Sequence, residues 1–242
     1  MSRSLEVLQR LENDNQLATK IPEPRTPTSN GSRPHSVTGE EVVKLVHSVF
    51  RSSSDAPRVV VFTGIDHGDG CTSICAGAAQ VLASQFAGSV CVVDANLRSP
   101  SLHHYFGIEN TTGLSEAILQ PGSIRDFAQQ LPESNVWVLT SGSPVIGPQA
   151  LLNSQNLCAR IQELRDAFDY VLIDVPPAGR YSDAVTVGSC TDGIILVLQS
   201  NMTRREPALK VKEEIEAANA RLLGAVLNKR TFPIPERLYK RL

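Results

Sequence analysis

Short apolar runs alternate with segments of helical spacing along most of the chain. The runs are rich in β-branched residues and bounded by Gly, Pro, Asp or Ser, which predicts strands at 59–62, 90–93, 136–139, 170–173, 194–198 and 225–227. Apolar positions in the intervening segments predict helices at 72–86, 113–119, 124–130, 148–167, 181–189 and 206–220. Nearly continuous apolar strands separated by helices predict an α/β fold, with a buried, mostly parallel sheet covered by helices on both faces.

The first part of the chain shows a different pattern. Leu5, Leu8 and Leu11 stand at helical spacing, and a segment rich in Pro, Thr and Ser follows. The leucines fit either a frayed helix that is unstable alone or a docking peptide for a partner. Thr38 and Glu41 then form a capping box before an apolar stripe, which predicts a new helix. We therefore divide the chain into a flexible segment and linker at 1–37 and one domain at 38–242.

Composition narrows the class of protein. The chain has 242 residues, of which 41% are hydrophobic and 20% charged, and this suits one α/β domain. A net charge of −2 without a long basic run argues against a nucleic-acid partner. The apolar runs fall short of the ~18 residues of a membrane helix, and the start of the chain lacks the apolar core of an export signal. Five cysteines without a C-x-x-C pair predict reduced thiols and a cytoplasmic location.

A glycine-rich loop joins the first predicted strand to the next helix. Backbone N–H groups and the helix dipole converge on an anion at such a junction, and Gly68 and Gly70 allow the backbone to come close to it. The phosphate-binding pattern G-x-x-x-x-G-K-[ST] is incomplete, because Gly70 and Thr72 match whereas Cys71 stands in the place of the lysine. The loop by itself fits a nucleotide site and a tight turn without a ligand about equally well.

Two further loops leave predicted strands with an acidic residue. Asp94 ends the second strand, where it would hold Mg²⁺, orient an attacking hydroxyl or simply cap the turn. Arg98 follows as a partner for a phosphate or for Asp94, or as a surface residue. Asp174 ends an apolar strand before two prolines, and a buried carboxylate is costly unless it is paired or bound to a metal. Because parallel strands end at one edge of a sheet, the three loops together predict a ligand site there.

With these three loops, the chain resembles the cytoplasmic kinase domain of the bacterial tyrosine kinases of capsule and exopolysaccharide synthesis. That family carries a P-loop of the P-G-E-G-K-[ST] kind, a strand that ends D-x-D-x-R and a strand that ends D-x-P-P. The corresponding segments here are His67-Gly-Asp-Gly-Cys-Thr72, Asp94-Ala-Asn-Leu-Arg98 and Asp174-Val-Pro-Pro177. Segments at 98–103, 113–115, 141–144, 150–152 and 224–228 also match in order, so the resemblance covers roughly residues 38–229.

The resemblance implies a P-loop NTPase-like fold and a site for ATP or ADP with Mg²⁺. The residues that would surround the phosphates are Gly68, Asp69, Gly70, Cys71, Thr72 and Ser73. The residues that would hold the metal are Thr72, Asp94 and Asp174. The residues that would serve catalysis are Asp94, Asp174 and Arg98, and Asn228 would meet the adenine.

The resemblance also implies partners. It places the chain beside a membrane polysaccharide-export adaptor, in the cytoplasm and recruited to the inner face of the plasma membrane. The family's subunit-ring helix has the pattern E-x-x-R-x-x-R, and Glu41, Lys44 and His47 hold those places here. This weakened version predicts contact between copies of the chain in a homo-oligomer. Neither nucleic acid nor a membrane span belongs to the implied function.

Three departures from the family pattern predict weak or absent kinase activity. Cys71 replaces the P-loop lysine, Asn96 replaces the second acidic residue of D-x-D-x-R, and Tyr239 alone remains of the C-terminal tyrosine cluster. Loss of a charge-assisted contact costs about 1.5–3 kcal/mol, and a thiolate at the helix N-terminus would repel phosphate further. We therefore expect a pseudokinase-like protein that regulates exopolysaccharide or capsule synthesis and export, with weak or absent binding of nucleotide and Mg²⁺.

Two alternatives stay open. The first is an active ATP-dependent tyrosine autokinase in which another cation, for instance from a neighbouring subunit, replaces the lysine. The second is an ATPase of the partition and cell-division type, which shares the framework but needs a P-loop lysine and usually a second lysine upstream, both missing here. Radiolabel transfer from ATP would support the first alternative, and a membrane-dependent ATPase cycle would support the second.

Overall fold

The structure is a computed structural model that describes residues 39–50 and 56–230; the predicted N-terminal segment and linker, with their leucines, lie outside this range, as does Tyr239. The described residues contain one seven-stranded sheet. Its strands are β1 (Val59–Gly64), β2 (Val90–Asp94), β3 (Gln129–Gln130), β4 (Val136–Leu139), β5 (Tyr170–Asp174), β6 (Gly193–Gln199) and β7 (Leu222–Asn228).

The strands stand in the order β3-β4-β2-β5-β1-β6-β7. Every neighbouring pair is parallel except β3 and β4, which are antiparallel. The carboxyl ends of β1, β2 and β5 therefore lie side by side at one edge of the sheet, with register partners such as Asp94 and Asp174 directly opposite each other. The predicted mostly parallel α/β sheet is confirmed.

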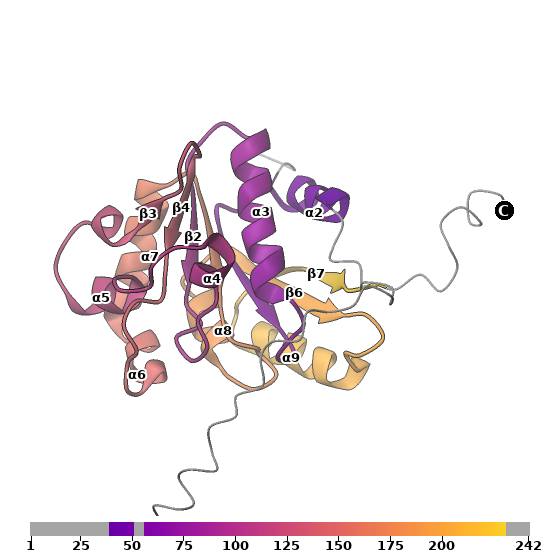
Figure 1. The fold of residues 1–242 in the computed structure, drawn as a ribbon. Coiled ribbons are helices and arrows are strands. Elements are labelled where there is room, and N and C mark those ends of the chain that lie inside the picture. The colour runs from indigo at the N-terminus through magenta and orange to yellow at the C-terminus, as the bar shows by residue number, and fades with distance from the viewer. Residues whose placement is uncertain (1–38, 51–55, 231–242) are drawn as a thin grey trace, which may run out of the picture. The chain divides into compact units, whose positions relative to one another are not determined.

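Helices cover both faces of the sheet (Figure 1). On one face lie α2 (Gly39–Phe50), α3 (Cys71–Gln85) and α4 (Leu102–Phe106), which share one buried core cluster. The other cluster belongs to α5 (Leu114–Leu119), η1 (Ile124–Phe127), α6 (Pro148–Leu152), α7 (Gln155–Ala167), α8 (Asp183–Gly188) and α9 (Arg205–Ala217).

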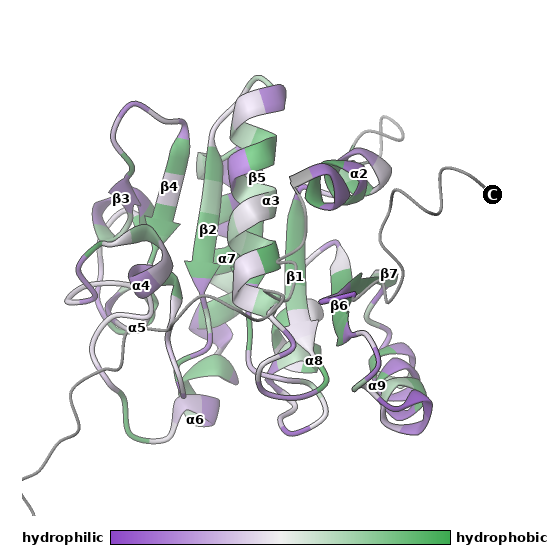
Figure 2. Cartoon of the chain, turned by 45° about the vertical axis from the view of Figure 1, so that its right-hand side comes forward, coloured by the Kyte–Doolittle hydropathy of each residue, from purple (hydrophilic) through white to green (hydrophobic). Residues whose placement is uncertain are grey.

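Strand β1 shows why the sheet needs both layers. Val59 and Val61 enter one core cluster, whereas Val60 and Phe62 enter the other, because successive side chains of a strand point to opposite faces. All four side chains are fully buried. Figure 2 shows strands such as β2 and β4 in the green of apolar residues, with the purple of polar residues on helices such as α2 and α9. This burial is the main stabilising contribution of the strands.

The structure differs from the sequence prediction in three elements. The single helix predicted at 148–167 is two helices, because α6 ends at Leu152 and α7 begins at Gln155, with Asn153 and Ser154 between them. The helix predicted at 124–130 stops after η1, since Gln129 and Gln130 pair with β4. Helix α4 was not predicted, because five residues are too few to show a helical period.

A disulfide joins α7 to the end of α8. Cys158 and Cys190 are bonded, with their Cα atoms 5.5 Å apart and a separation of 32 positions in sequence. The prediction that all cysteines are reduced is therefore wrong for this pair. Cysteine spacing alone does not reveal a pair that only the packing of two helices brings together. Cys71, Cys75 and Cys91 are free.

Among the described residues, no helix combines the length and the apolar character that crossing a bilayer requires.

Candidate functional site

A polar cavity of about 220 Å³ lies at the carboxyl ends of β1, β2 and β5. The three loops that the sequence singled out meet here. The lining residues are Gly64, Asp66, His67, Gly68, Asp69, Gly70, Cys71, Thr72, Asn96, Ser99, Ser101, Asp174, Val175 and Pro177. The predicted meeting of strand-end loops therefore occurs, as expected of an open parallel α/β sheet.

In the loop between β1 and α3, the side chain of Asp69 binds the backbone of the same loop. Asp69 is almost fully buried, and its Oδ2 accepts hydrogen bonds from the backbone N–H groups of Ile65 at 2.8 Å and Asp66 at 2.9 Å. Gly68 and Gly70 have φ of 88° and 86°, a left-handed conformation that favours glycine. The loop therefore owes its shape to an internal carboxylate and to two glycines.

A hydroxyl and a carboxylate lie together at the start of α3. Thr72 Oγ1 donates to Asp174 Oδ2 at 2.6 Å and lies 3.0 Å from the hydroxyl oxygen of Ser101. Burial, and after it the charge of Asp94, raises the pKa of Asp174 to about 7. Carboxylate and hydroxyl oxygens are ligands that suit Mg²⁺, which takes one or two carboxylates together with water and phosphate.

Asp94 has a different set of partners. Its Oδ2 accepts N–H groups of Ser101 at 2.9 Å and Leu102 at 3.0 Å, and its Oδ1 accepts the N–H of Asn96 at 3.1 Å. The side chain is fully buried, and this burial raises its pKa to about 6 in spite of the three hydrogen bonds. These hydrogen bonds show that Asp94 caps the turn that follows β2, which is one of the roles that the sequence left open. That Asp94 holds a metal ion stays a prediction.

We expect the free energy of unfolding, without divalent metal, to fall as the pH rises from about 4 to about 8. Asp94 and Asp174 have folded-state pKa values of about 6 and about 7, above the ordinary 3.8, so the folded chain holds these protons more tightly than the unfolded chain. Their stabilisation is complete below the unfolded-state pKa and is lost as the pH passes the folded-state values.

Urea denaturation at about pH 5 and about pH 8 measures this loss, which we expect to be on the order of 4 kcal/mol for the pair. The variant Asp174→Asn should show a much smaller difference, because an amide carries no titrating proton at this position. An equal pH dependence in the parent and in this variant would contradict the expectation.

Cys71 is the first residue of α3 and is half-buried. Burial, and after it the carboxylate of Asp174, raises the pKa of its thiol well above the ordinary value. The expected lean toward thiolate is therefore wrong: the helix N-terminus does not outweigh desolvation and a neighbouring carboxylate. A neutral thiol therefore stands at the position of the P-loop lysine.

Arg98 pairs with a residue from another element. Its Nε donates to Asp183 Oδ2 at 3.1 Å, and its guanidinium lies 4.3 Å from the centre of the Tyr181 ring. Of the partners that the sequence left open for Arg98, Asp94 is not the one it pairs with, and backbone N–H groups already bind that carboxylate. Asp183 is 1% exposed, and its Oδ1 has no hydrogen-bond partner among the described residues. Arg98 therefore compensates a buried charge.

Asn228 ends β7 and touches the same loop. Its Nδ2 donates to the carbonyl of Asp69 at 2.7 Å, and its Oδ1 accepts the N–H of Lys229 at 2.8 Å. A Cβ on Gly70 would lie 2.2 Å from this Nδ2, so only glycine fits there. Asn228 fastens the loop to the edge of the sheet, and its predicted contact with adenine stays a prediction.

Ser73 lies outside the 220 Å³ cavity. It is exposed and lines a neighbouring cavity of about 450 Å³ together with Gly70, Asn228 and Lys229. Its predicted contact with phosphate stays a prediction, as does the role of the loop residues in binding nucleotide. Gly70 lines both this cavity and the cavity of the strand-end loops, so the two cavities are neighbours.

Sequence reasoning missed three residues of this region. Ser101 contacts Thr72, Asp183 binds Arg98, and Lys229 donates to the Gly68 carbonyl. Ser101 follows D-x-D-x-R by three residues and was open to prediction as a polar residue of that loop. Asp183 and Lys229 carry no such signal, because their partners are 85 and 161 residues away in sequence.

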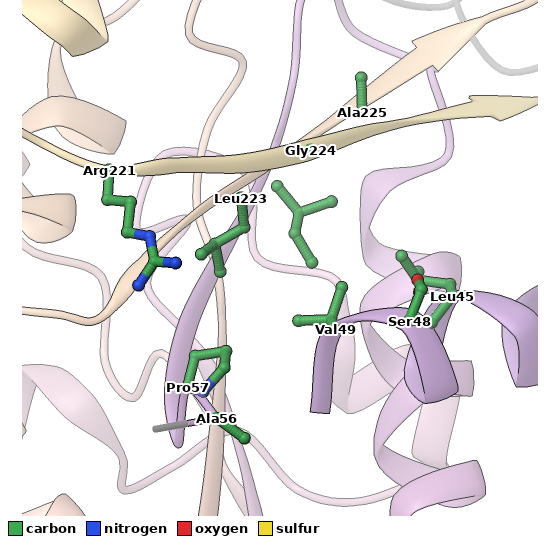
Figure 3. A pocket seen from close by; sticks show the side chains of 10 residues that line it. Leu45, Ser48, Val49, Ala56, Pro57, Arg221, Leu223, Gly224 and Ala225 are labelled. Carbon is green, nitrogen blue, oxygen red and sulfur yellow. Dashed lines mark hydrogen bonds between the residues drawn. The ribbon is translucent and has the colours of Figure 1, made fainter. Parts of the chain in front are cut away.

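A further cavity, of about 300 Å³, lies between α2 and β7 (Figure 3). Figure 3 shows Val49 of α2 beside Leu223, near the start of β7, and Leu45 of α2 also lines the cavity. This is the opposite end of β7 from Asn228, so the cavity is remote from the carboxyl edge of the sheet. We do not place phosphate chemistry there.

Comparison with known proteins places this site in a family. A family model described as cellulose biosynthesis protein BcsQ matches residues 58–212. Tyrosine-protein kinase YwqD of Bacillus subtilis (strain 168) is 33% identical over 198 residues, which cover 81% of this chain and 83% of the relative. The kinase domain of the Escherichia coli tyrosine kinase ETK has a TM-score of 0.74 at 25% identity, covering 90% of this chain and 89% of that chain.

A more distant structure shares the fold alone. A plasmid partition protein from Borrelia burgdorferi has a TM-score of 0.56 at 17% identity and covers 77% of this chain and 87% of its own. The fold is thus that of P-loop NTPase-like proteins, as the sequence predicted. The chain belongs to the P-loop family that the BcsQ model describes and, within it, to the bacterial tyrosine-protein kinases.

Proposed function

We propose that this chain is a degenerate bacterial tyrosine kinase domain that binds ATP or ADP weakly or not at all and regulates exopolysaccharide or capsule synthesis and export. Phosphoryl transfer to tyrosine is weak or absent. The observation that carries the proposal is the neutral, half-buried thiol of Cys71 at the lysine position of the phosphate loop. The surrounding loop, by contrast, keeps the left-handed glycines Gly68 and Gly70, which supports a close approach of its backbone to a ligand.

Electrostatics supports this proposal. The residues that line the cavity include Asp66, Asp69 and Asp174, and none of them is a lysine or an arginine. A polyphosphate that enters it therefore gains no direct ammonium contact from the loop at 64–73. Such a contact is worth about 1.5–3 kcal/mol in binding, and more where it stabilises charge in a transition state.

The residues present fit a magnesium ion that arrives with a nucleotide. Thr72 Oγ1 and Asp174 Oδ2, 2.6 Å apart, would hold the ion together with phosphate and water. When bound, Mg²⁺ neutralises charge on the phosphates. Asn96 carries an amide in place of a carboxylate, so it cannot act as the base that takes a proton from an acceptor tyrosine. The chain thus retains the means to position a phosphate better than the means to transfer it.

The proposed partner is a membrane polysaccharide-export adaptor, which would recruit the chain to the inner face of the plasma membrane. Helix α2 supports contact with another protein, because Lys44 is exposed and Glu41 is half-exposed. The Nε2 atom of His47 forms a hydrogen bond of 2.7 Å with the Oε1 atom of Gln85 in α3. One of the three residues of the predicted contact between copies therefore already has a partner within the chain. A homo-oligomer through α2 remains part of the proposal.

Transfer of radiolabel from ATP in the presence of Mg²⁺ tests the proposal. We expect less than about one hundredth of the transfer of an intact kinase such as YwqD, because the loop lacks its cation. The label is followed on the chain itself, on Tyr239→Phe and on an added polysaccharide-export adaptor. Transfer at the rate of the intact kinase would instead support the active autokinase. ATP hydrolysis that depends on membranes would support an ATPase of the partition type.

A further inference from the structure

We propose that the outer edge of β7 is a docking site for an extended segment of a partner protein, which adds a further strand to the sheet. The segment is a short run of apolar residues with acidic residues at its ends. This interaction goes beyond the proposed function, because it requires neither nucleotide nor kinase activity.

The two edges of the sheet differ in length and in polarity. One edge is β3, which has two residues, both glutamine, and offers little backbone for pairing. The other edge is β7, whose seven residues, Leu222–Asn228, include neither a charged residue nor a proline. Natural sheets protect exposed edges with short strands, charges or prolines. Within residues 39–50 and 56–230, β7 pairs with β6 alone, so its outer edge is typical of a strand that accepts a partner.

The backbone groups that an added strand would bind follow from the pairing of β7 with β6. The carbonyl of Asn228 accepts the N–H of Ser200 at 2.8 Å, so Asn228 faces β6. Along a strand, the N–H and C=O groups of successive residues alternate between its two sides. Leu227 and Ala225 therefore direct their backbone groups away from β6. Both residues are exposed, Leu227 by 54%, so these groups are in place for an added strand.

Apolar cavities flank β7 on both faces of the sheet. The cavity of about 300 Å³ on the side of α2 is lined on β7 by Leu223, Gly224 and Ala225 (Figure 3). A cavity of about 360 Å³ lies on the side of α9, where Leu227 and Leu209, which is 43% exposed, line it. Figures 1 and 2 both show β7 between these two helices. Because successive side chains of an added strand enter the two cavities in turn, a continuous apolar run fits this edge.

The charge around these cavities is positive. Their charged lining residues are Arg204, Arg205, Lys212 and Arg221, and no aspartate or glutamate stands among the described residues that line them. Lys212 pairs with Glu216, whereas the three arginines form no ion pair with any described carboxylate. Complementarity therefore favours acidic ends on the added strand. It disfavours a second copy of this chain, which would bring a like-charged edge to the contact.

The experiment measures binding of the full chain to a synthetic peptide by fluorescence anisotropy, at low and at high salt. The peptide has roughly five β-branched apolar residues, the length of a typical strand, between acidic ends. We expect binding that weakens with salt, because the charge attraction is screened. A peptide with lysines in place of the acidic residues should bind at least about tenfold more weakly. Amide hydrogen exchange of Ala225 and Leu227 should slow at least about tenfold in the complex.

The variant Ala225→Pro tests strand addition directly. It removes an N–H that faces away from β6, so the fold should tolerate it while peptide binding weakens at least about tenfold. Ala225→Val is the matched control, because it keeps the N–H, and it should bind as the parent does. Arg204→Gln together with Arg205→Gln should flatten the dependence on salt. Lys210→Gln, which lies on α9 outside the cavity, should leave it unchanged.

Equal peptide affinities of the parent and Ala225→Pro would overturn the proposal. Hydrogen exchange at Ala225 and Leu227 that stays unchanged in the complex would overturn it without the need for a variant, as would a peptide that does not bind at millimolar concentration. If the chain without peptide forms a dimer that Ala225→Pro dissociates, the edge belongs to a second copy and the proposal is overturned as well. None of these results bears on the proposed lack of kinase activity, which transfer of phosphate at an intact rate would overturn instead.

Discussion

The variant Cys71→Lys is expected to bind Mg-ADP about ten- to a hundredfold more tightly than the parent chain. Cys71 begins α3 and lines the cavity beside Asp174, so an ammonium at this position would face the phosphates and a carboxylate. The thiol that it replaces is neutral, since burial raises its pKa well above the ordinary value. The gain therefore reflects one added charge with no thiolate to remove.

Calorimetric titration of the parent and of the variant measures this gain. Cys71→Met is the matched control, because it lengthens the side chain without adding charge and should not raise the affinity. Equal affinities in Cys71→Lys and the parent would show that the missing ammonium does not limit binding. A gain in the methionine variant as large as that of the lysine variant would assign the effect to packing of the loop.

The variant Arg98→Met is expected to lower the free energy of unfolding by about 3 kcal/mol. The reason is Asp183, which is 1% exposed and whose Oδ2 has the Arg98 Nε at 3.1 Å as its ion-pair partner. Removal of the arginine leaves a buried carboxylate without compensation, which is one of the costlier single changes in a protein. The stacking of Arg98 on Tyr181 is lost as well.

Thermal and urea unfolding measure this loss, which corresponds to a fall in Tm of roughly 6–12 °C for a domain of this size. Two further variants sharpen the test. Adding Asp183→Asn to Arg98→Met should recover part of the stability, because the uncompensated charge is removed with it. Arg180→Met removes an ion pair whose side chains are 55% and 60% exposed, so we expect a change below about 0.5 kcal/mol. Equal losses in Arg98→Met and Arg180→Met would rule out the buried-charge explanation.

The strands were predictable because their cause is local. Each of β1, β2, β4, β5 and β6 is a short apolar run, and such runs are buried on both faces of a parallel sheet. Elements that depend on contacts with other segments were not predicted or were predicted with wrong bounds. β3 exists only because Gln129 and Gln130 pair with β4, and the break between α6 and α7 falls at two polar residues inside an otherwise helical stretch.

The position of the site was predictable from the same patterns. Parallel strands end at one edge, so Asp94, Asp174 and the glycine-rich loop had to meet once the sheet formed. What each polar group does there was not predictable. Sequence offered several partners for Asp94 and Arg98, and only the folded chain shows that the first caps a turn and the second pairs with Asp183.

By itself, the sequence determined the layered α/β fold, the edge that carries the site and the absence of the phosphate-loop lysine, since apolar periodicity and residue identity are properties of the chain. Only the tertiary structure decided that the thiol of Cys71 is neutral, that Cys158 pairs with Cys190 and that Lys229 rests on Gly68. These outcomes depend on desolvation and on contacts between segments far apart in sequence, which no local pattern records.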